Sequence, residues 1–203
     1  MPDPLEFQPT DDAWASVLKK LCTSRIQISM VLTGGGSGVI SRCLRRPGAS
    51  LNFVEAVMPY SRQATQQYLG VEPSEGYASA QTAKALAQTA QRRAASLSDD
   101  PVHAFGIALT AALPTTHDSS DPSINRNCRI HVASKSTSTF RGWSLFFSGQ
   151  PSEREVSEAM AEQMFLIAIQ DSLQQSGLHI DSDPARPLKA AGLNVITTHG
   201  DGV

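Results

Sequence analysis

The stretch Val31-Leu32-Thr33-Gly34-Gly35-Gly36-Ser37-Gly38 decides the fold, because an apolar run ends there in a hydroxyl residue followed by a glycine cluster. Such clusters occur where a group must approach the backbone closely or where the chain needs unusual backbone angles. Residues 27–32 are typical of a buried strand, and residues 39–44 are expected to form a helix that ends before Pro47. A strand, a glycine-rich turn and a helix together favour anion binding, since free N–H groups point outward at the helix start.

The named glycine motifs do not match this loop. The dinucleotide motif GxGxxG requires glycine at position 39 or 41, where Val39 and Ser41 stand. A P-loop requires GKS or GKT, and the esterase motif GxSxG again requires glycine at position 39. What remains is a generic cradle of small residues that we expect to bind an anion. Its members are Thr33, Gly34, Gly35, Gly36 and Ser37.

Three arginines follow the loop closely. Arg42, Arg45 and Arg46 are spaced by three and four residues, which places them on one face of a helix. They either form a solvated face or contact a phosphate, and the sequence alone leaves both interpretations open.

Further along the chain, predicted helices and strands alternate, which favours a layered α/β domain with a mixed sheet. Helices are expected over 11–22 and 39–44, in a short segment ending at Gly70, from Ser79 to about 95, and up to about 175. Strands are expected over 27–32, 51–58, 104–113, 129–134 and 139–148. Residues 115–127 are expected to form a long polar loop. We therefore expect one domain over 1–176 and a polar tail or linker over 177–203.

Composition excludes several classes of protein. The net charge of −2 gives no reason to expect a nucleic-acid partner. The three cysteines lack CxxC spacing and the histidines lack HxH or HxxxH spacing, so we expect no metal and no other cofactor. No apolar run approaches about 18 residues, and residues 1–10 do not resemble a signal peptide. We expect a cytoplasmic protein with reduced thiols and no membrane contact.

Several short blocks follow the glycine loop in a fixed order. They are Pro47-Gly48-Ala49-Ser50, Tyr60-Ser61, Leu69-Gly70-Val71 and the alanine-rich helix that begins after Ser79. This order resembles the C-terminal domain of the competence-damage protein CinA, the nicotinamide-nucleotide amidase family, over residues 11–175. That family carries ESCTGG, PGAS-like, YSNxxK, LGV and TGIAGP-type blocks, and residues 109–114 stand in place of the last one. The resemblance implies a three-layer α/β/α sandwich with a mixed sheet, and a homodimer.

The resemblance also implies a site. Family members hydrolyse the amide of nicotinamide mononucleotide, using a serine of the first loop helped by the tyrosine and lysine of YSNxxK. Counted back from Pro47 without a gap, that serine falls on Thr33; matching TGG to TGG with an insertion places it on Val31. The family tyrosine falls on Tyr60 and its lysine on Thr65, which is the main departure.

The loss of the lysine leaves three hypotheses. A hydroxyl nucleophile needs a neighbouring base, and arginine cannot act as one, although Glu55 or His131 could substitute for the lysine. The first hypothesis is a divergent domain that binds a pyridine-nucleotide-like phosphate ligand, with Thr33 and Tyr60 at the reacting amide. Its ligand contacts would be Gly34, Gly35, Gly36, Ser37, Ser61 and Thr110. The second is a hydrolase with a new base. The third is a non-catalytic interaction or assembly module, fused to or docking on a partner enzyme through residues 177–203.

Overall fold

The computed structural model describes residue 7 and residues 11–115, 127–148 and 153–201. Every helix and strand expected from the sequence is present. In chain order the elements are α1 (Asp11–Leu21), β1 (Gln27–Thr33), α2 (Gly38–Leu44), η2 (Ala49–Leu51), β2 (Phe53–Val57), α3 (Arg62–Leu69), α4 (Ala80–Leu97), η3 (Pro101–His103), β3 (Ala104–Ala112), β4 (Asn127–Lys135), β5 (Thr139–Ser148), α5 (Arg154–Gln175), α6 (Arg186–Ala190) and β6 (Ile196–Asp201). The long loop expected over 115–127 lies, apart from its two ends, outside the described residues.

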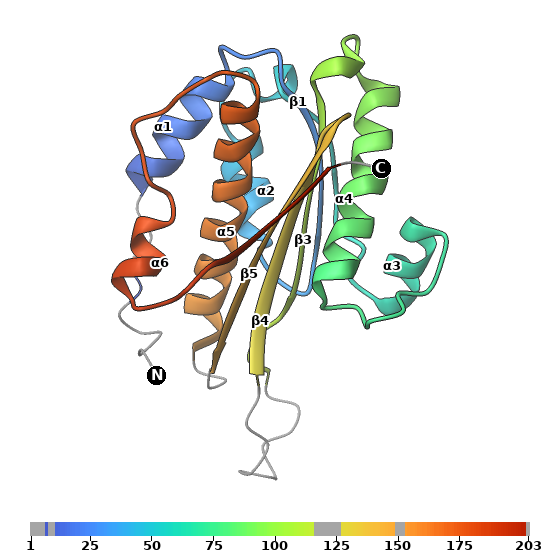
Figure 1. The fold of residues 1–203 in the computed structure, drawn as a ribbon, viewed down its shortest axis with the longest axis vertical. Coiled ribbons are helices and arrows are strands. Elements are labelled where there is room, and N and C mark those ends of the chain that lie inside the picture. The colour runs from blue at the N-terminus through green and yellow to red at the C-terminus, as the bar shows by residue number, and fades with distance from the viewer. Residues whose placement is uncertain (1–6, 8–10, 116–126, 149–152, 202–203) are drawn as a thin grey trace.

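The strands form one sheet in the order β2-β1-β3-β4-β5-β6. Strands β2, β1 and β3 run parallel, and β4, β5 and β6 pair antiparallel. Helices α3 and α4 cover one face of this sheet, and α1, α2, α5 and α6 cover the other (Figure 1). The three-layer sandwich with a mixed sheet is thus confirmed.

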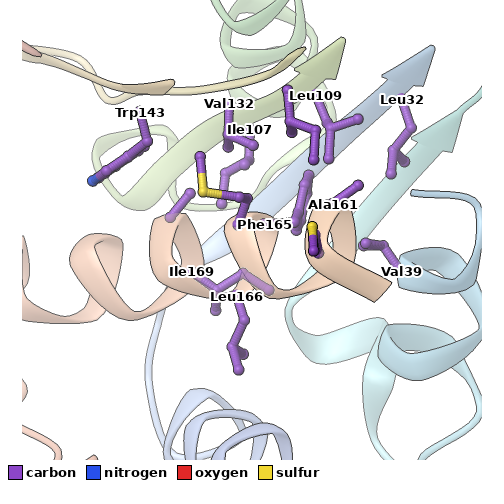
Figure 2. Packing of buried hydrophobic residues seen from close by; sticks show 14 of the residues in the cluster. Leu32, Val39, Ile107, Leu109, Val132, Trp143, Ala161, Phe165, Leu166 and Ile169 are labelled. Atoms are coloured by element: carbon purple, nitrogen blue, oxygen red, sulfur yellow. The ribbon is translucent and has the colours of Figure 1, made fainter. Parts of the chain in front are cut away.

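The core has two sides because strand side chains alternate between the faces of a sheet. Figure 2 shows Leu32, Ile107 and Leu109 of the sheet directed toward Ala161 and Phe165 of α5. The residues between them in sequence point the other way and pack on α4, whose buried face is rich in alanine. Small residues let α4 approach closely: a Cβ added to Gly106 would lie 2.2 Å from the Ala87 carbonyl oxygen.

The C-terminal segment corrects an expectation. We expected residues 177–203 to form a tail or linker, but the described part of this segment contributes α6 and the sixth strand of the sheet. Strand β6 pairs with β5 from Ser144↔Ile196 to Thr139↔Asp201. Leu188, Ala191 and Leu193 are buried in the core on the α5 side. The C-terminal segment is short and polar, but its few apolar residues are enough to pack it against the core of the domain.

Candidate functional site

The carboxyl ends of the parallel strands place the glycine loop beside the Tyr60 segment. The chain leaves β1 toward α2, on the α5 face of the sheet, whereas it leaves the adjacent strand β2 toward α3, on the opposite face. Neighbouring strands whose exits diverge in this way create a crevice at the edge of an open α/β sheet, where ligands commonly bind. Thr33 ends β1 at this edge, and Tyr60 follows β2.

Two threonines lie side by side at this edge. Thr33 is the register partner of Thr110 on β3. Their neighbours Leu32 and Leu109 face α5, so both threonines project to the α4 side. Thr110 Oγ1 donates a hydrogen bond of 2.6 Å to the Tyr77 carbonyl. Thr33 is only 6% exposed, and its hydroxyl makes no hydrogen bond within the part of the chain that the structure describes.

The glycine cluster is explained by close packing within the protein. Gly34 and Gly36 have φ of +79° and +74°, in the left-handed region that favours glycine. A Cβ on Gly34 would lie 2.0 Å from the Ala111 carbonyl oxygen, and one on Gly38 would lie 1.9 Å from Glu162 Oε1. The structures that approach the backbone of the glycine loop are therefore strand β3 and helix α5 of the same chain.

Side chains of helix α5 also form hydrogen bonds with backbone groups of the glycine loop. The Gly36 N–H donates to Glu158 Oε2 at 2.5 Å. Arg154 pairs with Glu158 at 2.7 Å and donates to the Gly34 carbonyl at 3.3 Å. A carboxylate thus stands at the Gly36 amide, where we expected a ligand anion. Ser37 is exposed at the start of α2, and its side chain makes no capping hydrogen bond.

The segment that resembles YSNxxK has no cationic side chain in the lysine position. Thr65 is 1% exposed, and its hydroxyl donates to the carbonyls of Pro59 at 2.8 Å and Ser61 at 3.1 Å. Ser61 caps α3 by accepting a hydrogen bond from the Ala64 N–H at 3.1 Å. Tyr60 is 70% exposed. The lysine position is therefore filled by a buried hydroxyl that stabilises the turn.

Of the two substitute bases considered from the sequence, Glu55 lies far from Thr33. Glu55 pairs in register with Ser29, four residues before Thr33, which is about 13 Å along a strand. Its carboxylate accepts from Arg93 Nε at 2.6 Å and from Ser29 Oγ at 2.9 Å. The hydrogen bond from Arg93 is the main cause that holds the Glu55 pKa below its usual value. Glu55 is thus engaged in an ion pair with Arg93, away from the crevice.

His131 lies nearer, in a polar row that crosses four strands. Thr33 is in register with Thr110, Thr110 with His131, and His131 with Ser144. The His131 Nδ1 and Ser144 Oγ atoms are 2.8 Å apart. Burial, and to a lesser extent the Arg129 charge, lowers the His131 pKa to about 4. His131 is therefore neutral at pH 7, but it stands two strands from Thr33, roughly 10 Å away.

Sequence reasoning named His131 as a possible substitute base, but it did not single out Ser144 or the row of residues that joins His131 to Thr33. No spacing along the chain could group these residues, because their proximity depends on the register of two antiparallel pairs. The only available signal was the alternation in β4, which places His131 on the same face as Ala133.

Two cations and a helix start lie at the same edge on the α4 side. Arg129 Nε donates to the Ala78 carbonyl at 2.7 Å, and the Arg62 guanidinium lies over the Tyr77 ring. The first turn of α4 follows, capped by the Ser79 hydroxyl, which accepts from the Thr82 N–H at 3.1 Å. The positive end of this 18-residue helix adds to the two cations.

Two further searches concern other kinds of site. Among the described residues, no three His, Cys, Asp or Glu side chains are grouped closely enough to hold a metal ion. No helix within the described ranges combines the length and apolar character needed to cross a membrane.

Known proteins resemble this chain in structure rather than in sequence. No protein-family model matches the sequence, and no curated protein matches it. A CinA superfamily protein from Klebsiella pneumoniae 700603 has a TM-score of 0.63 and 16% identity, covering 83% of this chain and 99% of its own. One from Enterobacter cloacae has a TM-score of 0.61 and 13% identity, covering 81% and 94%. The competence/damage inducible protein CihA from Agrobacterium tumefaciens has a TM-score of 0.53 and 21% identity, covering 83% and 97%.

These matches span nearly the whole of each solved structure, and they are to proteins of the superfamily that the sequence resembles. At such low identity they show the fold. The chain folds as a CinA-like domain.

Proposed function

We propose that this CinA-like domain binds a pyridine-nucleotide-like phosphate ligand in the crevice between the ends of β1 and β2, and that it does not hydrolyse the ligand amide. The observation that carries the proposal is the Thr33 hydroxyl, which is nearly buried, lies at the diverging exits of two parallel strands and has no partner among the described residues. A hydroxyl in such a position is available to a ligand.

The charge around the crevice favours an anionic ligand on its α4 side. Arg62, Arg129 and the start of α4 supply positive potential there, and Thr110, the register partner of Thr33, donates to the carbonyl of Tyr77, whose ring contacts Arg62. On the α5 side Glu158 already takes the Gly36 amide, so a phosphate would meet a carboxylate. We therefore assign the phosphate to the α4 side, with Thr33, Thr110, Tyr60 and Ser61 around the ligand and Ser37 at the rim.

The proposed absence of hydrolysis follows from the missing base. A threonine hydroxyl is a weak nucleophile unless a neighbouring group accepts its proton. Thr65 in the lysine position is buried and engaged with backbone carbonyls. Glu55 serves an ion pair with Arg93, and His131 is two strands away. No described side chain stands in position to activate Thr33.

The test is calorimetric titration of nicotinamide mononucleotide into the wild-type protein, Thr33→Val and Thr137→Val. Thr33→Val removes a hydroxyl without breaking a hydrogen bond in the described structure, so the unfolding midpoint should not fall, whereas Kd should rise about tenfold, the loss of one hydrogen bond. Thr137, exposed in the turn between β4 and β5, is the matched control. The nucleotide recovered afterwards should be unchanged.

The outcomes are distinct. Absence of heat with the wild-type protein would refute the proposed ligand. Equal Kd for Thr33→Val and the wild-type protein would remove Thr33 from the site. Recovery of the acid nucleotide, lost in Thr33→Val, would instead support a hydrolase with a rebuilt centre.

A further inference from the structure

A cavity of about 460 Å³ lies between α1 and the end of α2. These helices cover the sheet face opposite the Thr33 and Thr110 side chains (Figure 1). This volume is within the range of small-molecule sites. Its walls are apolar on the α1 side, apart from Asp11 and Lys19, and cationic on the α2 side. The lining includes Trp14, Leu18, Lys19, Arg45, Arg46 and Pro47.

One of the cations around the cavity is already neutralised. Arg42 donates through Nε to Glu162 and through Nη1 to Asp11, both at 2.7 Å, and its guanidinium lies 5.3 Å from the centre of the Trp14 ring. These contacts make Arg42 part of the wall and fix the orientation of Trp14.

The remaining cations are not held in this way, although the Asp11 pKa, which is lowered mainly by the hydrogen bond from Arg42, is lowered slightly further by the charge of Arg45. Lys19, Arg45 and Arg46 form no ion pair within the residues that the structure describes. Arg46 contacts the Cys22 sulfur and donates to Asn52 Oδ1 at 3.0 Å, while its buried Nε has no hydrogen-bond partner. Together with Arg42, these are four cations against the two carboxylates Asp11 and Glu162, and a net positive charge at one concave surface attracts anions.

From this arrangement we infer a second ligand site, which binds a small organic anion: a phosphate or carboxylate group attached to a flat apolar body. Guanidinium groups match the geometry of phosphate and carboxylate oxygens. The apolar wall around Trp14, Leu18 and Pro47 suits a planar ring. In this proposal, the arginines that follow the glycine loop bind a ligand at a separate site. The end of α2 is about 10 Å from the start of α2, where the glycine loop lies.

The experiment titrates 1-naphthyl phosphate into the full chain, with 1-naphthol and inorganic phosphate as probes of the two halves of the ligand. Naphthyl phosphate should bind with a Kd at least tenfold below that of either half. In an amide-proton NMR spectrum, the indole signal of Trp14 should shift and that of Trp143, the second tryptophan, should not.

Variants test the charges. Lys19→Gln/Arg45→Gln should raise the Kd for naphthyl phosphate at least tenfold, while the matched double variant Arg25→Gln/Arg92→Gln, which removes equal charge outside the cavity, should stay within twofold of wild type. Equal unfolding midpoints would show that neither pair disturbs the fold. Thr33→Val should bind naphthyl phosphate normally, which separates this site from the crevice at β1 and β2.

Several results would overturn the inference. These are absence of naphthyl phosphate binding at millimolar concentration, equal weakening by both double variants, and a ligand-induced shift at Trp143 without one at Trp14. Unaltered binding by Lys19→Gln/Arg45→Gln would likewise show that the ligand does not use these cations.

Discussion

At the scale of the residue, the glycine loop shows how a single chemical pattern can satisfy two requirements. Gly34 needs a positive φ, and it also lies against the Ala111 carbonyl of β3. The sequence indicated close approach to the backbone, but it could not show that the approaching groups are β3 and α5 themselves. Those contacts join residues that are more than 70 positions apart in the chain.

Gly34→Ala should therefore lower the free energy of unfolding more than a positive φ alone explains. Gly70 is the matched control, because its φ is +76° and no atom lies within 4 Å of an added Cβ. We expect Gly34→Ala to cost about 1–3 kcal/mol more than Gly70→Ala, the range typical of overpacking. Urea denaturation of both variants measures the difference; equal costs would mean that the contact with Ala111 is unimportant.

His131 makes stability depend on pH. Its pKa is about 6.5 when unfolded and about 4 when folded, so the unfolded chain binds more protons between these values, and stability falls as pH drops from 6.5 toward 4. Lowering the pH from 7 to 4.5 should therefore lower the free energy of unfolding by about 2–3 kcal/mol through this group. His131→Asn keeps a polar atom near the Nδ1 position and does not titrate. Urea midpoints of both proteins against pH should diverge in acid, and parallel curves would contradict the assignment.

Only part of the candidate site could be predicted from the amino-acid sequence. The missing lysine was visible at Thr65, and Thr33 and Thr110 could be identified from the resemblance. The row that continues through His131 to Ser144 could not, because strand register depends on the whole sheet. The Glu158 carboxylate at the Gly36 amide was invisible for the same reason: α5 reaches the loop only in the folded chain.

At the scale of the element, the strongly periodic segments were predicted well and the C-terminal segment was not. Residues 196–201 have little apolar character and follow two prolines, which is typical of a tail. They form an edge strand, where one side of the backbone is unpaired and polar side chains are tolerated. The apolar residues of α6 and the turn after it then dock on the core.

Two leucine-sized side chains in this segment test whether it belongs to the domain. Leu188 is fully buried and Ile196 is 49% exposed. Leu188→Ala should lower the free energy of unfolding by about 2–5 kcal/mol, as buried aliphatic truncations do. Ile196→Ala should cost much less, because half of its side chain is already exposed. If thermal or urea unfolding detected no cost at Leu188, the segment would behave as the tail we first expected.

At the scale of the whole molecule, the alternation of helices and strands predicted the layers, and the order β2-β1-β3 determines where the crevice forms. Because β1 and β2 are parallel neighbours, the loop after Thr33 and the segment at Tyr60 begin at the same edge of the sheet, and they then leave toward opposite faces. The sequence alone indicated the glycine loop and the Tyr60 segment, but the fact that they lie at the same edge depends on the order of the strands in the sheet. The homodimer implied by the resemblance stays a prediction, which sedimentation equilibrium tests.

The central claim is that the crevice binds a nicotinamide nucleotide and leaves its amide intact. The most direct test is thermal unfolding with and without nicotinamide mononucleotide, with ammonia assayed in the same tubes. A ligand at about 100 times its Kd adds about 2.7 kcal/mol of stability, which in a chain of this size raises Tm by roughly 5–10 °C. We predict that rise without ammonia. Ammonia release would contradict the loss of hydrolysis, and an unchanged Tm at saturating nucleotide would contradict binding itself.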